Sequence, residues 1–243
     1  MKLDGKTALI TGGGSGIGLS VARLFLRDGA RVTICGRDAA KLDRAAAELR
    51  GGDRVMVHAG DLSDPAVAKE ASAAATKRFG KVDILVNNAG ANIKERAFRE
   101  LTPESWDLLL RANLDSAFHC MQAVLPQMRE RKDGVIINVS SVSGKRASPL
   151  GGAGYAAAKF GLGALATCLA LEEKDTGIRV STICPGEVNT PILDHRPVAV
   201  TDDQRRKMLQ PEDIAQAVLF VATMPRHVSI PELIIMPTGA MYM

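Results

Sequence analysis

Tyr155 and Lys159 lie four residues apart in a stretch rich in alanine, so a helix there would place both side chains on one face. A free phenol has a pKa of about 10, which is too high for efficient proton exchange at neutral pH. A neighbouring ammonium group favours the phenolate and lowers this pKa, so the pair is suited to general acid/base chemistry. Taken alone, however, such a pair on a helix is usually a solvated surface pair.

A glycine-rich segment, TGGGSGIG at 11–18, follows an apolar run and opens directly onto a helical pattern. Its glycines let the backbone turn tightly and approach a pyrophosphate, which would rest on the positive N-terminus of the helix. The spacing is G-x-x-x-G-x-G rather than the strict dinucleotide fingerprint, and a glycine-rich turn without a ligand is the alternative. The contacts that we expect from this segment are Gly12, Ser15, Gly16, Ile17 and Gly18.

The second apolar run ends in the sequence CGRD at 35–38. A carboxylate at this strand end would bind the adenosine ribose and select NAD, whereas an arginine accommodates a 2′-phosphate and selects NADP. Gly36 removes the usual acid and Arg37 follows at once, so NADP(H) is favoured and NAD(H) is the alternative. Asp38 has a second possible role, as the cap of the next helix.

Two further loops follow apolar runs. The carboxylate of Asp61 could accept a hydrogen bond from an adenine amino group, or it could be an ordinary turn aspartate. The sequence NNAG at 87–90 would let the chain pass close to a cofactor, although loop asparagines can equally satisfy backbone groups at a turn. These loops add Asp61, Leu62, Asn88, Ala89 and Gly90 to the expected cofactor contacts.

The elements that must position these residues follow an alternating pattern of short apolar runs and longer stretches of helical period. The runs are Thr7–Thr11, Arg31–Cys35, Arg54–His58, Val82–Val86, Gly134–Val139, Arg179–Cys184 and Glu232–Met236. The helical stretches are 17–28, 38–50, 64–79, 102–130, 153–175 and 211–223. Asp64 and Thr102 each precede a proline, as a cap residue precedes the first helical turn.

Sustained alternation of strand and helix predicts right-handed crossovers and a parallel sheet with helices on both faces. The runs lack polar alternation, as strands buried on both faces require. We therefore expect an α/β fold with about seven parallel strands, doubly wound and of Rossmann type. No linker or internal repeat interrupts the pattern, so a single domain over residues 1–243 is expected.

Six features stand in a fixed order along almost the whole chain. They are TGGGSGIG at 11–18, NNAG at 87–90, Asn113, Ser141, YAAAK at 155–159 and PGEVNT at 185–190. In this order and at these spacings the chain resembles the classical short-chain dehydrogenase/reductase family. The resemblance implies an enzyme that transfers a hydride between a nicotinamide dinucleotide and a carbonyl or alcohol substrate. In such an enzyme the cofactor donates or accepts the hydride, and the protein orients the reactants.

The resemblance also implies roles for individual residues. Tyr155 would be the general acid/base, and Lys159 would lower its pKa and bind the nicotinamide ribose. Ser141 would stabilise the substrate oxygen, and it is preferred over Ser140 and Ser143 because it is the second serine of a Ser-Ser pair.

The family pattern extends to Asn113 and the PGEVNT loop. Asn113 would hold a water that links the lysine to solvent, and its alternative is a polar residue satisfied between two helices. Backbone around Val188 would dock the nicotinamide carboxamide, and Thr190 would help to fix the cofactor. The loop contacts expected in total are Pro185, Gly186, Val188 and Thr190.

Composition argues against other classes of protein. The chain has 46% hydrophobic and 24% charged residues, which is typical of soluble globular proteins. A net charge of +4 without a basic stripe argues against nucleic-acid binding. The cysteines and histidines are scattered along the sequence, so we expect no metal site. We expect the cysteines to be small, buried hydrophobic side chains. We see no signal-peptide pattern and no apolar stretch of about eighteen residues, so we expect a cytoplasmic protein outside the membrane.

Substrate identity is expected to depend on the loops at 91–98, 143–154 and 187–210. Four basic residues in these loops could favour an acidic or polar substrate, but solvated surface charge is the favoured explanation. They are Arg96, Lys145, Arg146 and Arg196.

Two broader questions concern assembly and turnover. The long helices at 102–130 and 153–175 resemble those that pair between subunits in tetramers of the family, so we expect a homodimer or homotetramer.

The main alternative function is a dinucleotide-binding regulator without turnover, which would typically lack the tyrosine or lysine. A nucleotide-sugar epimerase or dehydratase is a further alternative, and the short C-terminal region disfavours it.

Overall fold

The computed structural model describes residues 1–240. Seven strands form one sheet in the order β3-β2-β1-β4-β5-β6-β7, and every adjacent pair is parallel. The strands are β1 (Thr7–Thr11), β2 (Arg31–Gly36), β3 (Val55–Ala59), β4 (Ile84–Asn87), β5 (Gly134–Val139), β6 (Ile178–Pro185) and β7 (Glu232–Ile235). The doubly wound α/β fold predicted from the alternating pattern is confirmed.

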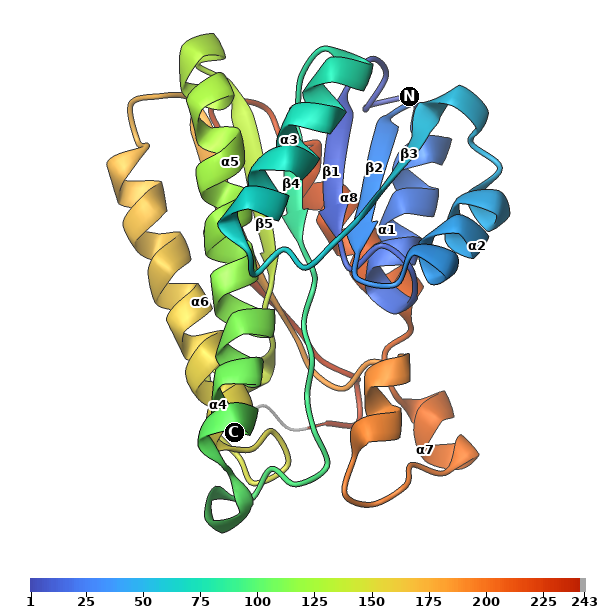
Figure 1. The fold of residues 1–243 in the computed structure, drawn as a ribbon, viewed down its shortest axis with the longest axis vertical. Coiled ribbons are helices and arrows are strands. Elements are labelled where there is room, and N and C mark those ends of the chain that lie inside the picture. The colour runs from blue at the N-terminus through green and yellow to red at the C-terminus, as the bar shows by residue number, and fades with distance from the viewer. Residues whose placement is uncertain (241–243) are drawn as a thin grey trace.

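Helices cover both faces of the sheet (Figure 1). One layer consists of α1 (Gly16–Arg27), α2 (Ala39–Leu49) and α8 (Pro211–Ala222). The opposite layer consists of α3 (Pro65–Phe79), α5 (Ser116–Arg131) and α6 (Ala153–Glu172). Central strands bury side chains in both directions, so Ile10 packs into the first layer and Leu9 into the second. This double burial explains why the strands read as uninterrupted apolar runs.

The stretch expected as one helix over 102–130 contains a change of helical geometry. It consists of α4 (Pro103–Leu110), a π-helical turn (Arg111–Asp115) and then α5. A π turn inserts an extra residue into a helix and is frequent at functional sites. Asn113 lies at its centre, so the turn rather than a regular helix sets the direction of this side chain.

A short helix, α7 (Asp202–Lys207), was not predicted. Its residues are all polar, so no apolar stripe marks it, and it begins with a capping box between Thr201 and Gln204. The two caps predicted beside prolines are confirmed, because Asp64 accepts from the backbone of Ala66 and Thr102 accepts from that of Ser105.

Two expectations based on composition are corrected. No apolar stretch long enough to span a membrane was expected, but α6 is long and apolar enough by length and composition alone. Core helices of soluble proteins pass the same test. In the fold this helix packs against α4, the π turn and β6. Of the four cysteines, Cys168 is exposed while the other three are buried.

Asp83 joins the amino ends of β1 and β4. Its side chain is only 5% exposed, and its Oδ2 accepts a hydrogen bond from the backbone N–H of Thr7 at 2.9 Å. Lys81 Nζ lies 3.0 Å and Lys6 Nζ 3.7 Å from its Oδ1. The carboxylate therefore satisfies a buried strand N–H while two lysines balance its charge.

We predict that Asp83→Ala lowers the free energy of unfolding by about 2–4 kcal/mol, because it leaves the Thr7 N–H unpaired in the interior. Urea unfolding followed by circular dichroism measures this change. The matched control is Asp53→Ala, which removes an ion pair with Arg78 from a fully exposed carboxylate and should leave stability nearly unchanged. Equal effects of the two substitutions would contradict the role given to Asp83.

Candidate active site

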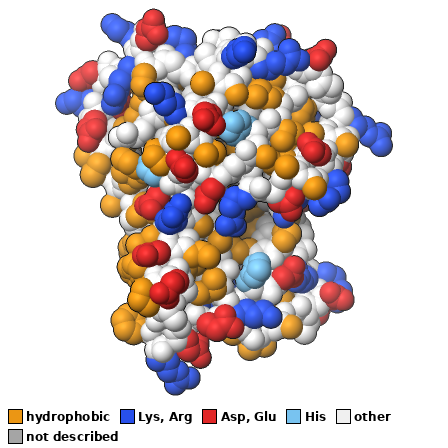
Figure 2. All heavy atoms as spheres, in the orientation of Figure 1, with side chains coloured by type: hydrophobic (Ala, Val, Ile, Leu, Met, Phe, Trp, Pro, Cys, Tyr) orange, Lys and Arg blue, Asp and Glu red, His pale blue; other side chains and the backbone are white. Residues whose placement is uncertain are grey.

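A cleft of about 840 Å³ lies at the carboxyl ends of the strands. This is where open α/β sheets bind ligands, and Figure 2 shows the hollow between the body of the sheet and the smaller region that contains α7. All the residues predicted for the site line this cleft except Gly18. Gly18 is buried beneath the glycine-rich turn, where a Cβ atom would lie 2.4 Å from the carbonyl oxygen of Gly12. Close packing against the turn therefore requires a glycine at this position.

The glycine-rich turn is held against the end of β4. Thr11 Oγ1 accepts hydrogen bonds from the backbone N–H groups of Asn88 and Ala89 at 2.9 and 2.8 Å. The side-chain amide of Asn88 donates to the carbonyl of Thr11 at 3.0 Å. Asn88 therefore satisfies a backbone carbonyl at the turn, and it lines the cleft together with Ala89 and Gly90.

The N-terminus of α1 faces the same space. The N-cap Ser15 makes no side-chain cap, and the first turn of the helix contains no acidic residue. Gly12 and Gly16 both have positive φ, at 65° and 53°, which allows the chain to turn sharply into the helix. The uncapped positive end of α1 suits a pyrophosphate group.

The far end of the cleft, beside β2 and β3, contains both basic and acidic side chains. Arg37 and Lys41 both line it, and Lys41 was missed by sequence reasoning although it lies one helical turn beyond Arg37. Asp38 Oδ1 accepts a hydrogen bond from the backbone N–H of Lys41 at 2.9 Å. Asp38 therefore caps α2, which is the second role considered for it in the sequence. Partial burial raises the pKa of Asp61, but hydrogen bonds from Ser63 and the charge of Arg37 outweigh it and lower the pKa overall.

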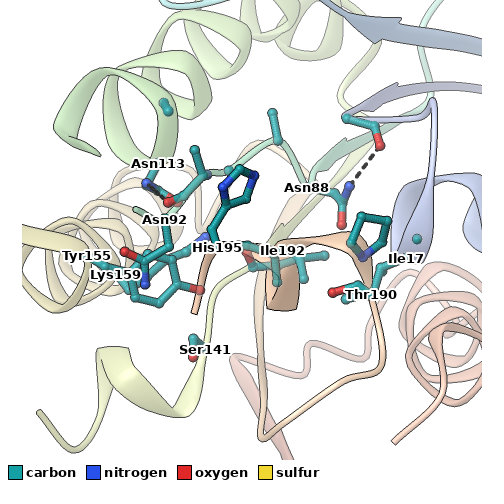
Figure 3. A pocket seen from close by; sticks show the side chains of 18 of the residues that line it. Ile17, Asn88, Asn92, Asn113, Ser141, Tyr155, Lys159, Thr190, Ile192 and His195 are labelled. Atoms are coloured by element: carbon teal, nitrogen blue, oxygen red, sulfur yellow. Dashed lines mark hydrogen bonds between the residues drawn. The ribbon is translucent and has the colours of Figure 1, made fainter. Parts of the chain in front are cut away.

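The predicted catalytic residues lie together in the middle of the cleft (Figure 3). Lys159 Nζ lies 5.6 Å from the centre of the Tyr155 ring and donates to the carbonyl of Val139, at the end of β5, at 3.1 Å. Ser141 lies beside Tyr155 and acts to lower the pKa of its phenol. The neighbouring Ser140 points elsewhere, since its hydroxyl donates to the carbonyl of Lys159 at 3.3 Å. Ser141 is therefore the serine placed beside the phenol.

Asn113 reaches the cluster from the π turn. Its Oδ1 accepts from the backbone N–H of Ala91 at 3.2 Å, and its Nδ2 donates to the carbonyls of Ala91 and Leu109, both at 2.8 Å. A Cβ atom on Gly90 would lie 2.7 Å from Asn113 Oδ1 and 3.5 Å from Lys159 Nζ, so these three residues are close neighbours. The amide is satisfied by the loop at Ala91 and by its own helix, and not between two helices.

Burial dominates the electrostatics of the cluster. It raises the pKa of Tyr155, and the neighbouring Ser141 and the charge of Arg96 only partly oppose it. Burial also lowers the pKa of Lys159 from 10.5 to about 8, so the lysine keeps most of its charge at neutral pH. The pKa of Tyr155 is therefore raised here, whereas the sequence argument expected Lys159 to lower it.

Arg96 was expected to be a solvated surface residue, and this expectation is wrong. Its side chain is 5% exposed and lines the cleft. Nε donates to the carbonyl of Ile93 at 2.7 Å, Nη1 donates to that of Leu150 at 2.9 Å, and Nη2 donates to that of His195. Arg196 also lines the cleft and pairs with Glu187 at 2.8 Å. Sequence alone could not show that carbonyls from three loops converge on Arg96.

Comparison with known proteins agrees with this geometry. The sequence profile of the short chain dehydrogenase family matches residues 6–199. D-beta-hydroxybutyrate dehydrogenase of Rhizobium meliloti is 36% identical over 218 residues, which cover 88% of this chain and 83% of that protein.

Two solved structures resemble the whole chain. One is a 3-ketoacyl-(acyl-carrier-protein) reductase from Brucella melitensis complexed with NADH, which is 33% identical with a TM-score of 0.88 and covers 97% of this chain and 98% of its own. The other is a metagenomic short-chain oxidoreductase in complex with NADP, which is 33% identical with a TM-score of 0.84 and covers 98% of this chain and 100% of its own. The chain belongs to the short-chain dehydrogenase family, and it is an NAD(P)-dependent oxidoreductase that acts on CH–OH or C=O groups.

We predict that Lys159→Met raises the melting temperature at about pH 7 by several degrees, at about 2–4 °C for each kcal/mol, because it removes a buried charge. The folded-state pKa of Lys159, about 8, lies below its ordinary value of 10.5. The wild type therefore gains stability as the pH rises from about 8 to about 10.5, and the advantage of the variant should shrink at about pH 9.5.

Thermal unfolding followed by circular dichroism at the two pH values measures this difference. Lys69→Met replaces an exposed lysine of α3 and is the control, which should show no such pH dependence. A variant at Lys159 that melts below the wild type at neutral pH would refute the electrostatic cost assigned to this side chain.

Proposed function

We propose that this chain catalyses reversible hydride transfer between NADP(H), with NAD(H) as the alternative cofactor, and a small carbonyl compound or the corresponding alcohol. The observation that carries the proposal is the contact of Tyr155 with Ser141 beside Lys159, in one cleft with the uncapped N-terminus of α1. Similarity to a hydroxybutyrate dehydrogenase and a ketoacyl reductase supports a hydroxy or oxo compound as the substrate.

The residues present fit a dinucleotide. The cleft volume of about 840 Å³ is within the usual range for ligand pockets, and backbone N–H groups at the start of α1 suit the pyrophosphate. The nicotinamide dinucleotide would supply the hydride donor or acceptor when bound. The contacts that we propose for it are Gly12, Ser15, Gly16, Ile17, Arg37, Asp61, Leu62, Asn88, Ala89, Gly90, Tyr155, Lys159, Pro185, Gly186, Val188 and Thr190.

The side chains of the protein would transfer the proton. Tyr155 donates its phenolic proton to the substrate oxygen during reduction and accepts it back during oxidation, while Ser141 orients that oxygen. A positive charge on Lys159, whose Nζ lies 5.6 Å from the centre of the Tyr155 ring, would stabilise the phenolate that forms. A water near Lys159 and Asn113 would return the proton from solvent.

Further proposals concern the whole molecule. The chain would act as a single catalytic domain in the cytoplasm and form a homodimer or homotetramer. Apolar side chains exposed on α5 and α6, Phe118, Phe160 and Leu171, support pairing through these two helices.

Tyr155→Phe tests the proton chemistry. We predict that kcat for carbonyl reduction falls by about 10²–10⁴-fold, because the phenolic proton is lost while the ring still fills its place. Steady-state oxidation of NADPH measures the rate, and cofactor fluorescence should show unchanged NADPH binding. Ser140→Ala is the control, because its hydroxyl serves the α6 backbone and its loss should cost far less. Full activity of Tyr155→Phe would contradict the mechanism.

Arg37→Ala tests the choice of cofactor. We predict that KM for NADPH rises at least about tenfold, because a charge-assisted contact with the 2′-phosphate is lost, while KM for NADH changes little. Arg31→Ala provides the control, since Arg31 is exposed at the opposite end of β2. A wild-type enzyme that uses NADH more efficiently than NADPH would overturn the preference.

A further inference from the structure

The substrate end of the cleft contains a buried cation without a counter-ion. Arg96 is 5% exposed, and within residues 1–240 no carboxylate forms an ion pair with its guanidinium. Its three nitrogens donate to the backbone carbonyls of Ile93, Leu150 and His195. Neutral carbonyls satisfy hydrogen bonds but do not cancel a charge, so the guanidinium keeps its full charge in a poorly solvated place.

A second cation lies close to the first. The charge of Arg196 contributes to lowering the pKa of Arg96, after the larger effect of burial, so the two guanidinium groups repel each other. Arg196 has a partner in Glu187, but that carboxylate is 43% exposed and is already paired at 2.8 Å. Because Glu187 offsets the charge of Arg196, the charge without a counter-ion at this end of the cleft is that of Arg96.

The N-terminus of α6 adds to this charge. Gly152 is the N-cap, no side chain caps the helix, and its first turn contains no acidic residue. A Cβ atom on Gly152 would lie 2.7 Å from the Cβ of Arg96, so the helix end and the arginine are in contact. A helix N-terminus attracts negative charge, and here it adds to a buried guanidinium.

This positive corner adjoins the reacting group. Tyr155 lies in the first turn of α6, and its phenolic oxygen interacts with the charge of Arg96. Arg96, Tyr155, Asn92 and Leu150 all line one continuous cleft. A substrate whose oxygen contacts Tyr155 therefore lies in the same cleft as the guanidinium.

We infer that the substrate carries a carboxylate, which is bound beside Arg96 while the reacting carbonyl contacts Tyr155 and Ser141. A carboxylate would neutralise the buried charge, and it can accept from Nη1 and Nη2, each of which carries a second N–H group. The substrate class is then a short oxo acid, and the product is the corresponding hydroxy acid. This inference rests on the proposed function.

The chemistry balances without a further reactant. Reduction adds a hydride from the reduced nicotinamide cofactor to the carbonyl carbon, and the proton of Tyr155 to the carbonyl oxygen. The carboxylate is unchanged, since it serves only to bind and orient the substrate. Oxidation of the hydroxy acid reverses both transfers.

The test compares acids with their neutral esters. Pyruvate and acetoacetate are each assayed beside the methyl ester with wild-type enzyme and saturating NADPH. We expect kcat/KM for at least one acid to exceed that of its ester by about tenfold or more. In Arg96→Gln the KM for that acid should rise at least about tenfold, while kcat/KM for the ester changes by less than about threefold.

Two variants serve as controls. Arg96→Lys keeps the charge and should recover part of the affinity for the acid. Arg99→Gln removes an exposed arginine three residues away and should leave both substrates unaffected. Melting temperature and NADPH fluorescence establish that each variant is folded and binds cofactor.

Failure of the carboxylate inference and failure of the proposed function give different results. If Arg96→Gln reduces acid and ester turnover equally, Arg96 only braces the loops and the inference fails. If the wild type prefers the esters, the inference fails while the proposed reductase activity stands, and this comparison needs no variant to fold. If NADPH binds but no acid, ester, ketone or aldehyde is reduced, the proposed function itself fails.

Discussion

The hydrogen bond from Lys159 Nζ to the carbonyl of Val139 fastens α6 to the last residue of β5, and the arrangement of the cleft depends on it. A second bond, from Ser140 Oγ to the carbonyl of Lys159, fastens the same turn of the helix from the other side. With this turn fixed, Tyr155 lies one turn earlier and meets Ser141 where the strand ends. The cost is a lysine charge held away from water, which burial opposes.

Much of the fold could be predicted because parallel strands covered on both faces must be apolar along their length. The bounds of β1 and β5 agree with the apolar runs, and the other strands differ at their ends by at most two residues. The π turn around Asn113 could not be predicted, since one inserted residue barely disturbs a helical period. The polar helix α7 was missed because it buries no stripe of its own.

The site, like the fold, contains some features that the sequence predicts and others that it does not. Motif residues could be placed in the cleft because each follows a strand, and strand ends meet at one edge of a parallel sheet. For Gly18 the structure adds a packing reason for the glycine, the close approach of the Gly12 carbonyl, which motif spacing alone does not show. Arg96 was named as a possible substrate contact, but its burial could not be predicted, because it depends on the carbonyls of Ile93, Leu150 and His195, which are distant in sequence or lie in irregular loops.

The parallel pairing of β1 with β4 has a consequence for how the chain folds. It aligns Ala8 with Ile84, so the centre of the sheet closes only after the intervening βαβ units have been crossed. Contacts between such distant positions make folding slow, because the entropy of a long loop is lost before the contact forms. A ligand that spans the cleft can bind only after this closure, and by mass action it would reduce the unfolded population. Cofactor supply during synthesis would then influence how much native protein accumulates.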